Sequence, residues 1–78
     1  MINKKKTAFN LARMMDYECI SARQAADRLG VHFSTIYHYR DGRRLPTLEH
    51  LVSLIELTDG KYKLEDIVDY CIDKENAV

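Results

Sequence analysis

Apolar residues recur at helical spacing over most of the chain. Three sets share the i, i+3, i+4, i+7 spacing of one helix face: Ala8, Leu11, Ala12 and Met15; Leu48, Leu51, Val52 and Ile55; and Leu64, Ile67, Val68 and Cys71. The first set predicts a helix from a cap at Thr7 to about Tyr17, and the second a helix that begins after Thr47 and is closed by Gly60. The third set predicts a helix that reaches about residue 73.

Two shorter helices joined by a tight turn are predicted between the first and second sets, over residues 21–42. Ser21 and Gln24 have the spacing of a capping box, and Gly30 stands where a left-handed residue would end the first short helix. Residues 33–40 form the second, with Ile36 and Tyr39 facing inward. Because no stretch is a candidate strand, the fold class is all-α, a compact five-helix bundle.

Four residues of the second short helix should point away from its partner. They are spaced i, i+1, i+4, i+5: Phe33, Ser34, Tyr37 and His38. An exposed ridge on a helix held across another is how helix-turn-helix proteins enter the DNA major groove. The alternative is that Phe33 and Tyr37 are buried against the first helix or a partner subunit.

The order of residues resembles the lambda-repressor and Cro-type (XRE) helix-turn-helix family. The resemblance covers roughly residues 11–67 and rests on the spacing of one set: Ala26, Leu29-Gly30-Val31, Ile36, Tyr39, Gly42 and Pro46. It implies a compact five-helix lambda-repressor-like DNA-binding domain over residues 7–73, with the helix-turn-helix at residues 21–42. A flexible basic arm at residues 1–6 and a frayed tail at residues 74–78 would flank it.

The resemblance also implies site residues. The expected base-reading residues are His32, Phe33, Ser34, Tyr37 and His38, and the expected phosphate-binding residues are Arg23, Thr35, Arg40, Arg43 and Arg44. Ser34 and His38 can hydrogen-bond to base edges, and an aromatic ring can cover a thymine methyl.

Four positions depart from the family pattern. Ala22 replaces a usual glutamine, His32 a usual Ser or Thr cap, and Cys19 a frequent glycine. Asp41 would repel phosphate.

Charge is unevenly distributed in a chain of zero net charge. Residues 1–46 hold nine basic and four acidic side chains, a formal charge of +5, and residues 47–78 hold three basic and eight acidic ones, a formal charge of −5. A chain that turns its basic half toward phosphate gains affinity and orientation. The alternatives are that the charges solvate two surfaces and that the N-terminal lysines only aid solubility.

Other kinds of site find little support in the sequence. Cys19 and Cys71 are expected to be core thiols, because neither has a second cysteine nearby or a histidine at metal-ligand spacing. No nucleophile–base set, paired carboxylates or glycine-rich phosphate loop indicates an enzyme, and no cofactor or metal is expected. With no membrane-spanning run or signal peptide, a cytoplasmic location is expected.

The sequence thus predicts a sequence-specific DNA-binding transcriptional regulator. The specific expectation is a small phage or mobile-element repressor that inserts helix 33–40 into the major groove and binds double-stranded DNA, at an inverted-repeat operator, as a homodimer. The alternative is an antitoxin or protein-interaction module of the same fold.

Overall fold

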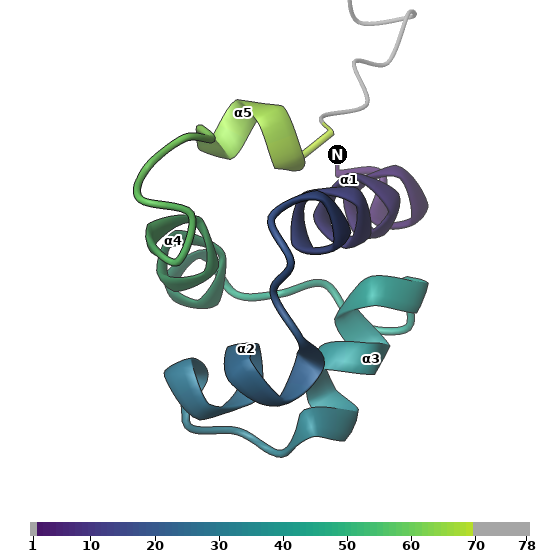
Figure 1. Cartoon of the computed structure of the whole chain (residues 1–78). Coiled ribbons are helices and arrows are strands. Elements are labelled where there is room, and N and C mark those ends of the chain that lie inside the picture. Colours follow the sequence, from purple (N-terminus) through teal and green to yellow (C-terminus); the bar gives the residue numbers. More distant parts are fainter. Residues whose placement is uncertain (1, 70–78) are drawn as a thin grey trace, which may run out of the picture.

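The computed structural model describes residues 2–69, which form five helices (Figure 1). In chain order these are α1 (Lys4–Tyr17), α2 (Ala22–Leu29), α3 (Phe33–Asp41), α4 (Leu48–Glu56) and α5 (Leu64–Ile67). In Figure 1, α2 and α3 form one end of the bundle and α5 lies at the other, beside α1. The predicted all-α, five-helix fold is confirmed.

The local signals for α2 and α4 lie where the sequence placed them. The Ser21 side chain accepts a hydrogen bond from the Gln24 backbone N–H at 3.0 Å, and Thr47 accepts one from the His50 N–H at 3.2 Å. Each bond satisfies one backbone donor of a helix's first turn. Gly30 ends α2 with a φ of +70°, a left-handed conformation that glycine adopts without steric cost. Within the described structure, Gln24 returns no side-chain bond to Ser21, so only half of the capping box forms.

The first helix begins earlier than predicted. Asn3 is its cap and accepts a hydrogen bond from the Lys6 N–H at 3.0 Å. Residues 4–6 are therefore the first turn of α1, and the expectation that they belong to a flexible arm is wrong. Thr7 is buried, and its hydroxyl accepts a bond from the Asp69 N–H at 3.0 Å. Thr7 thus ties α1 to the segment after α5 instead of capping the helix.

The buried face of α4 differs from the predicted stripe. Leu51 and Leu54 are buried, whereas 65% of Leu48 and 41% of Val52 is exposed. The apolar surface of this helix is broader than one face, and α4 turns Leu51 and Leu54 toward α2 and α5, with which it packs. The prediction that Leu48 and Val52 belong to the core is wrong.

The last helix is shorter than predicted. It ends at Ile67, because Val68 is extended, with φ −78° and ψ 121°. A β-branched residue favours this conformation. It lets the Asp69 carbonyl accept a hydrogen bond from the Asn3 N–H at 2.8 Å, beside the Thr7 bond. Residues 70–73 of the predicted helix, with Cys71 among them, and the predicted tail at residues 74–78 lie outside the described residues.

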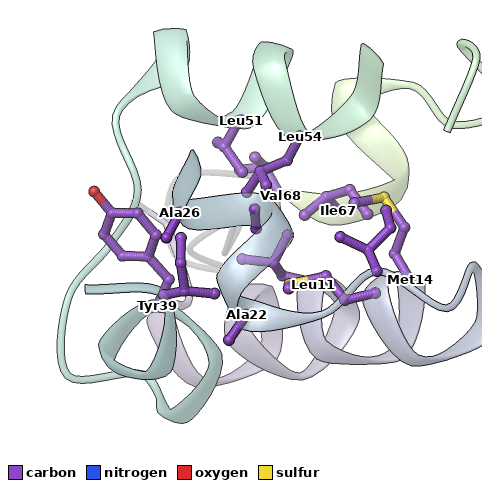
Figure 2. Close-up of a cluster of buried hydrophobic side chains, with 13 residues drawn as sticks. Leu11, Met14, Ala22, Ala26, Tyr39, Leu51, Leu54, Ile67 and Val68 are labelled. Carbon is purple, nitrogen blue, oxygen red and sulfur yellow. The ribbon is translucent and has the colours of Figure 1, made fainter. Parts of the chain in front are cut away.

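One cluster of buried side chains joins all five helices (Figure 2). Its fully buried members include Leu11 and Met15 of α1, Ile36 of α3 and Leu54 of α4. Figure 2 shows Tyr39 at the edge of the cluster, with its hydroxyl directed away from the other labelled side chains. This core fixes α3 from its inner side and leaves its outer side available.

Cys19 is exposed and is not the core thiol expected from the sequence. It adopts a φ of +57° in the link from α1 to α2. The family's frequent glycine at this position has a physical reason, because a left-handed backbone is unfavourable for residues with a Cβ atom.

Two further observations concern residues 2–69. No helix among them has the length and apolar character needed to cross a membrane. No three of their histidine, cysteine, aspartate or glutamate side chains are grouped to hold a metal ion.

Candidate nucleic-acid interface

Helices α2 and α3 pack against each other across the short turn at Gly30, and α3 also packs against α1. Ile36 is fully buried and Tyr39 is 5% exposed, as predicted. These two side chains anchor one face of α3 in the core. The opposite face of α3 is therefore held outward in a fixed orientation.

The outward face carries a row of contacting rings, here called the aromatic ridge and made of His32, Phe33 and Tyr37. Phe33 is 44% exposed and Tyr37 52%. Their ring centroids lie 6.2 Å apart in an edge-to-face arrangement, and the His32 and Phe33 centroids lie 4.2 Å apart. Neither Phe33 nor Tyr37 is buried in the core formed by residues 2–69, so packing among those residues does not account for them.

The other predicted base-reading residues lie beside the ridge. Ser34 and His38 are both half-buried, as is the predicted phosphate ligand Thr35. All three are on α3, the helix that carries Phe33 and Tyr37.

His32 caps α3. Its Nδ1 atom accepts a hydrogen bond from the Ser34 backbone N–H at 3.2 Å and lies 2.9 Å from the Ser34 hydroxyl oxygen. An Nδ1 atom that accepts places the proton of the neutral ring on Nε2. His32 therefore caps the helix in place of the usual Ser or Thr. Its Nε2–H remains as a second polar group.

The two arginines nearest the end of α3 are paired with carboxylates. Arg40 Nη2 lies 2.7 Å from Asp16 Oδ1, and Arg43 Nε lies 3.3 Å from Asp41 Oδ2. Asp41 Oδ1 also accepts the Arg43 backbone N–H at 3.1 Å. Asp41 thus orders the loop after α3 while offsetting one of its positive charges. The other two predicted phosphate-binding arginines, Arg23 and Arg44, pair with no carboxylate among residues 2–69.

The structure brings Lys5 to this loop, which the sequence did not predict. A Cβ atom placed on Gly42 would lie 3.7 Å from both the Lys5 Cα and the Ala8 Cβ. The first turn of α1 therefore packs against the residue that precedes Arg43 and Arg44. The sequence signal for this arrangement was Asn3, a favoured cap residue, which extends α1 to include the lysines.

A second contact that the sequence did not predict holds the C-terminal part of α3. The Tyr39 hydroxyl and His50 Nδ1 are 2.8 Å apart, a hydrogen bond between α3 and α4. The tyrosine was expected to face inward, which is confirmed, but nothing in the spacing identified His50 as its partner.

A model of the lambda-repressor-type (XRE) helix-turn-helix family matches residues 20–62, more than half of the chain. The chain therefore belongs to the helix-turn-helix family. The matched residues run from Ile20, before α2, to Tyr62, after α4. No curated protein and no solved structure matches the chain.

Membership in the helix-turn-helix family makes this chain a DNA-binding regulatory protein. In this family the second helix of the pair is the recognition helix. The second helix of the pair in this chain is α3, which carries Phe33 and Tyr37 of the aromatic ridge.

Proposed function

We propose that this chain is a sequence-specific transcriptional regulator that inserts residues 33–40 of α3 into the major groove of double-stranded DNA. The observation that carries the proposal is the two-sided nature of α3. Ile36 and Tyr39 are buried, while Phe33 and Tyr37 on the outer side are about half exposed. A helix held in this way can present its outer side chains to base edges without any change in the core.

In this proposal, DNA binding is carried by the ten residues expected from the sequence, in two sets, and by one residue that the structure adds. The base-reading set is His32, Phe33, Ser34, Tyr37 and His38, and the phosphate-binding set is Arg23, Thr35, Arg40, Arg43 and Arg44. The position of Lys5 beside Gly42 adds this lysine to the second set. Contacts to phosphate fix the orientation of the protein, and contacts to base edges select the sequence.

We further propose that the active form is a homodimer on an inverted-repeat operator, as expected of a small phage or mobile-element repressor. One α3 presents too few base contacts for useful specificity, and a second half-site supplies the rest. An apolar groove of about 230 Å³ supports a second copy as the partner. Its lining includes Leu48, Leu51, Leu64 and Val68, from α4, α5 and the residue after α5.

The second candidate function is that of an antitoxin or other protein-interaction module of the same fold. The exposed side chain of Leu48 in this groove favours it, because large exposed apolar groups mark interfaces of some kind. A chain that stays monomeric at high concentration would favour this candidate over the homodimer.

Selection of bound sequences from a random pool of DNA duplexes tests the first function. We expect His38→Ala and Ser34→Ala to relax the base preference of the selected site. We expect Arg43→Ala to weaken binding to all sequences and to reduce the slope of log affinity against log salt by about one.

The matched control for Arg43→Ala is Arg28→Ala. Arg28 is also partly exposed and also paired with a carboxylate, that of Glu56, but it lies near the end of α2 that precedes Gly30. Its removal should leave the salt slope unchanged. Equal losses on selected and random DNA for all three test variants would refute the assignment of roles.

A further inference from the structure

At the start of α3, polar groups of His32 and Ser34 form hydrogen bonds with each other. His32 Nδ1 lies 3.2 Å from the Ser34 backbone nitrogen and 2.9 Å from the Ser34 hydroxyl oxygen. His32 Nδ1 is thus engaged in capping α3, and the Ser34 hydroxyl already has a partner within the protein. Use of Nδ1 on DNA would leave the Ser34 backbone N–H of the first turn unsatisfied.

The surface that remains free at this end of α3 is aromatic. Phe33 and Tyr37, one helical turn apart, are 44% and 52% exposed, and the Phe33 ring carries no polar atom. Their edge-to-face contact and the adjoining His32 ring make one continuous surface. The Phe33 ring forms no hydrogen bond with a base edge, so it gains affinity there only from apolar groups.

In the major groove, the apolar group that distinguishes one base pair from another is the C5-methyl group of thymine. Cytosine has hydrogen at C5 and an amino group at C4, and 5-methylcytosine carries the same methyl group at the same carbon. From this chemistry we infer that the aromatic ridge recognises C5-methyl groups, so that thymine and 5-methylcytosine are equivalent ligands for it. Cytosine methylation would then create or strengthen a binding site.

The spacing of the rings fits more than one methyl group. The Phe33 and Tyr37 centroids are 6.2 Å apart, and base pairs are stacked about 3.4 Å apart. The two rings can therefore meet methyl groups on base pairs that are adjacent or next but one. This inference rests on the proposed function, because it describes what α3 reads once it lies in the groove.

The test uses the purified chain and the half-site selected from the random pool. Each thymine of the half-site is replaced in turn by deoxyuridine, which removes only the methyl group. At the position that responds, four otherwise identical duplexes are compared: those with T·A, U·A, 5-methyl-C·G and C·G. Both comparisons within a base pair, T against U and 5-methyl-C against C, isolate the methyl group.

We expect affinity to fall about fourfold on loss of the methyl group in both comparisons, the effect of burying one such carbon. Recognition of the polar edge would instead separate the T and U duplexes from the two C duplexes. Phe33→Ala or Tyr37→Ala should bring the methyl ratio close to one. The methyl ratio compares two duplexes that are bound by the same variant. A smaller folded fraction of that variant therefore lowers both affinities equally and leaves the ratio unchanged.

The matched control is Phe9→Ala, which removes a 58% exposed phenyl ring from α1 and should leave the methyl ratio intact. Specific binding with no loss at any deoxyuridine, a selected half-site without thymine, or a methyl ratio that survives both ridge substitutions would overturn the inference while the proposed function stands. Failure to select any sequence would overturn both.

Discussion

Cys19 shows how a single residue can be suboptimal for the backbone it occupies. With Asp59, it is one of two non-glycine residues in the range 2–69 with positive φ. Its side chain is exposed, so no packing contact in the core accounts for the choice of cysteine. The left-handed conformation costs a residue with a Cβ atom roughly 1–2 kcal/mol.

Cys19→Gly should therefore stabilise the fold. Part of the relief is offset by the greater freedom of glycine in the unfolded chain, so we expect the free energy of unfolding to rise by about 0.5–1 kcal/mol. Chemical denaturation monitored by circular dichroism measures this difference. Cys19→Ala keeps the Cβ atom and should give no comparable gain, whereas an equal gain from both variants would assign the effect to the thiol.

For single residues, the sequence predicted the role correctly where that role depends on residues nearby in the chain. The caps Ser21 and Thr47 and the stop at Gly30 follow from local chemistry and were predicted. The tie between Thr7 and Asp69 was not, since it joins positions 62 residues apart. A threonine near the start of a helix looks the same in the sequence whether it caps that helix or binds a distant amide.

Among the helices, α3 is the one whose placement matters most for the proposed DNA binding. Its inner side is held by a polar contact as well as by packing. The Tyr39 hydroxyl and His50 Nδ1, 2.8 Å apart, connect it to the beginning of α4. Tyr39 is 5% exposed. Loss of its hydroxyl would leave the His50 nitrogen without its protein partner.

Tyr39→Phe should lower the free energy of unfolding by about 1 kcal/mol, the typical net worth of such a hydrogen bond. Denaturant titration of the purified chain gives the value. Tyr37→Phe removes a hydroxyl from an exposed ring on the same helix and should change stability by less than about 0.5 kcal/mol. If the two variants were equally destabilised, the contact with His50 would have no special role.

The elements were predictable to different degrees for physical reasons. Helix α2 was predicted with its observed bounds, because a cap and a glycine mark both of its ends. The bounds of α5 were not, since the apolar spacing continues past Ile67 while the backbone turns extended at Val68 to reach α1. On α4, periodicity showed that the helix is apolar but not which part of a broad apolar surface faces the core.

Over the whole molecule, the candidate base-reading residues could be predicted from the sequence as a set at one helix, but the arrangement of the charged residues around them could not. The exposure of Phe33 and Tyr37 followed from their spacing. The pairing of Arg40 with Asp16 and the approach of Lys5 to Gly42 required knowledge of how α1 crosses α3. These relations decide which positive charges are free to meet phosphate.

The proposed homodimer leads to a prediction for the whole molecule. Leu48→Glu places a charge in the apolar groove, and because Leu48 is 65% exposed the fold should tolerate it. We expect light scattering to show a shift from dimer to monomer. Affinity for an inverted repeat should fall at least tenfold, while affinity for a single half-site stays within about twofold.

Phe9→Glu is the control, since it places the same charge on an exposed apolar residue of α1 outside the groove. A dimer that persists in Leu48→Glu and dissociates in Phe9→Glu would move the interface to α1. A wild-type chain that remains monomeric at every concentration would remove the second copy as the occupant of the groove.

The bonds from Asn3 and Thr7 to Asp69 close the described chain into a loop that contains both helices of the DNA-reading pair. Contacts within that pair are local in sequence, whereas closing the loop requires two distant segments to meet. Bringing them together costs more conformational entropy, so this step of folding is slower. The pair should thus take shape before the loop closes during folding. The Asp69 amide would exchange its hydrogen whenever the closure opens, which makes it a reporter of that opening.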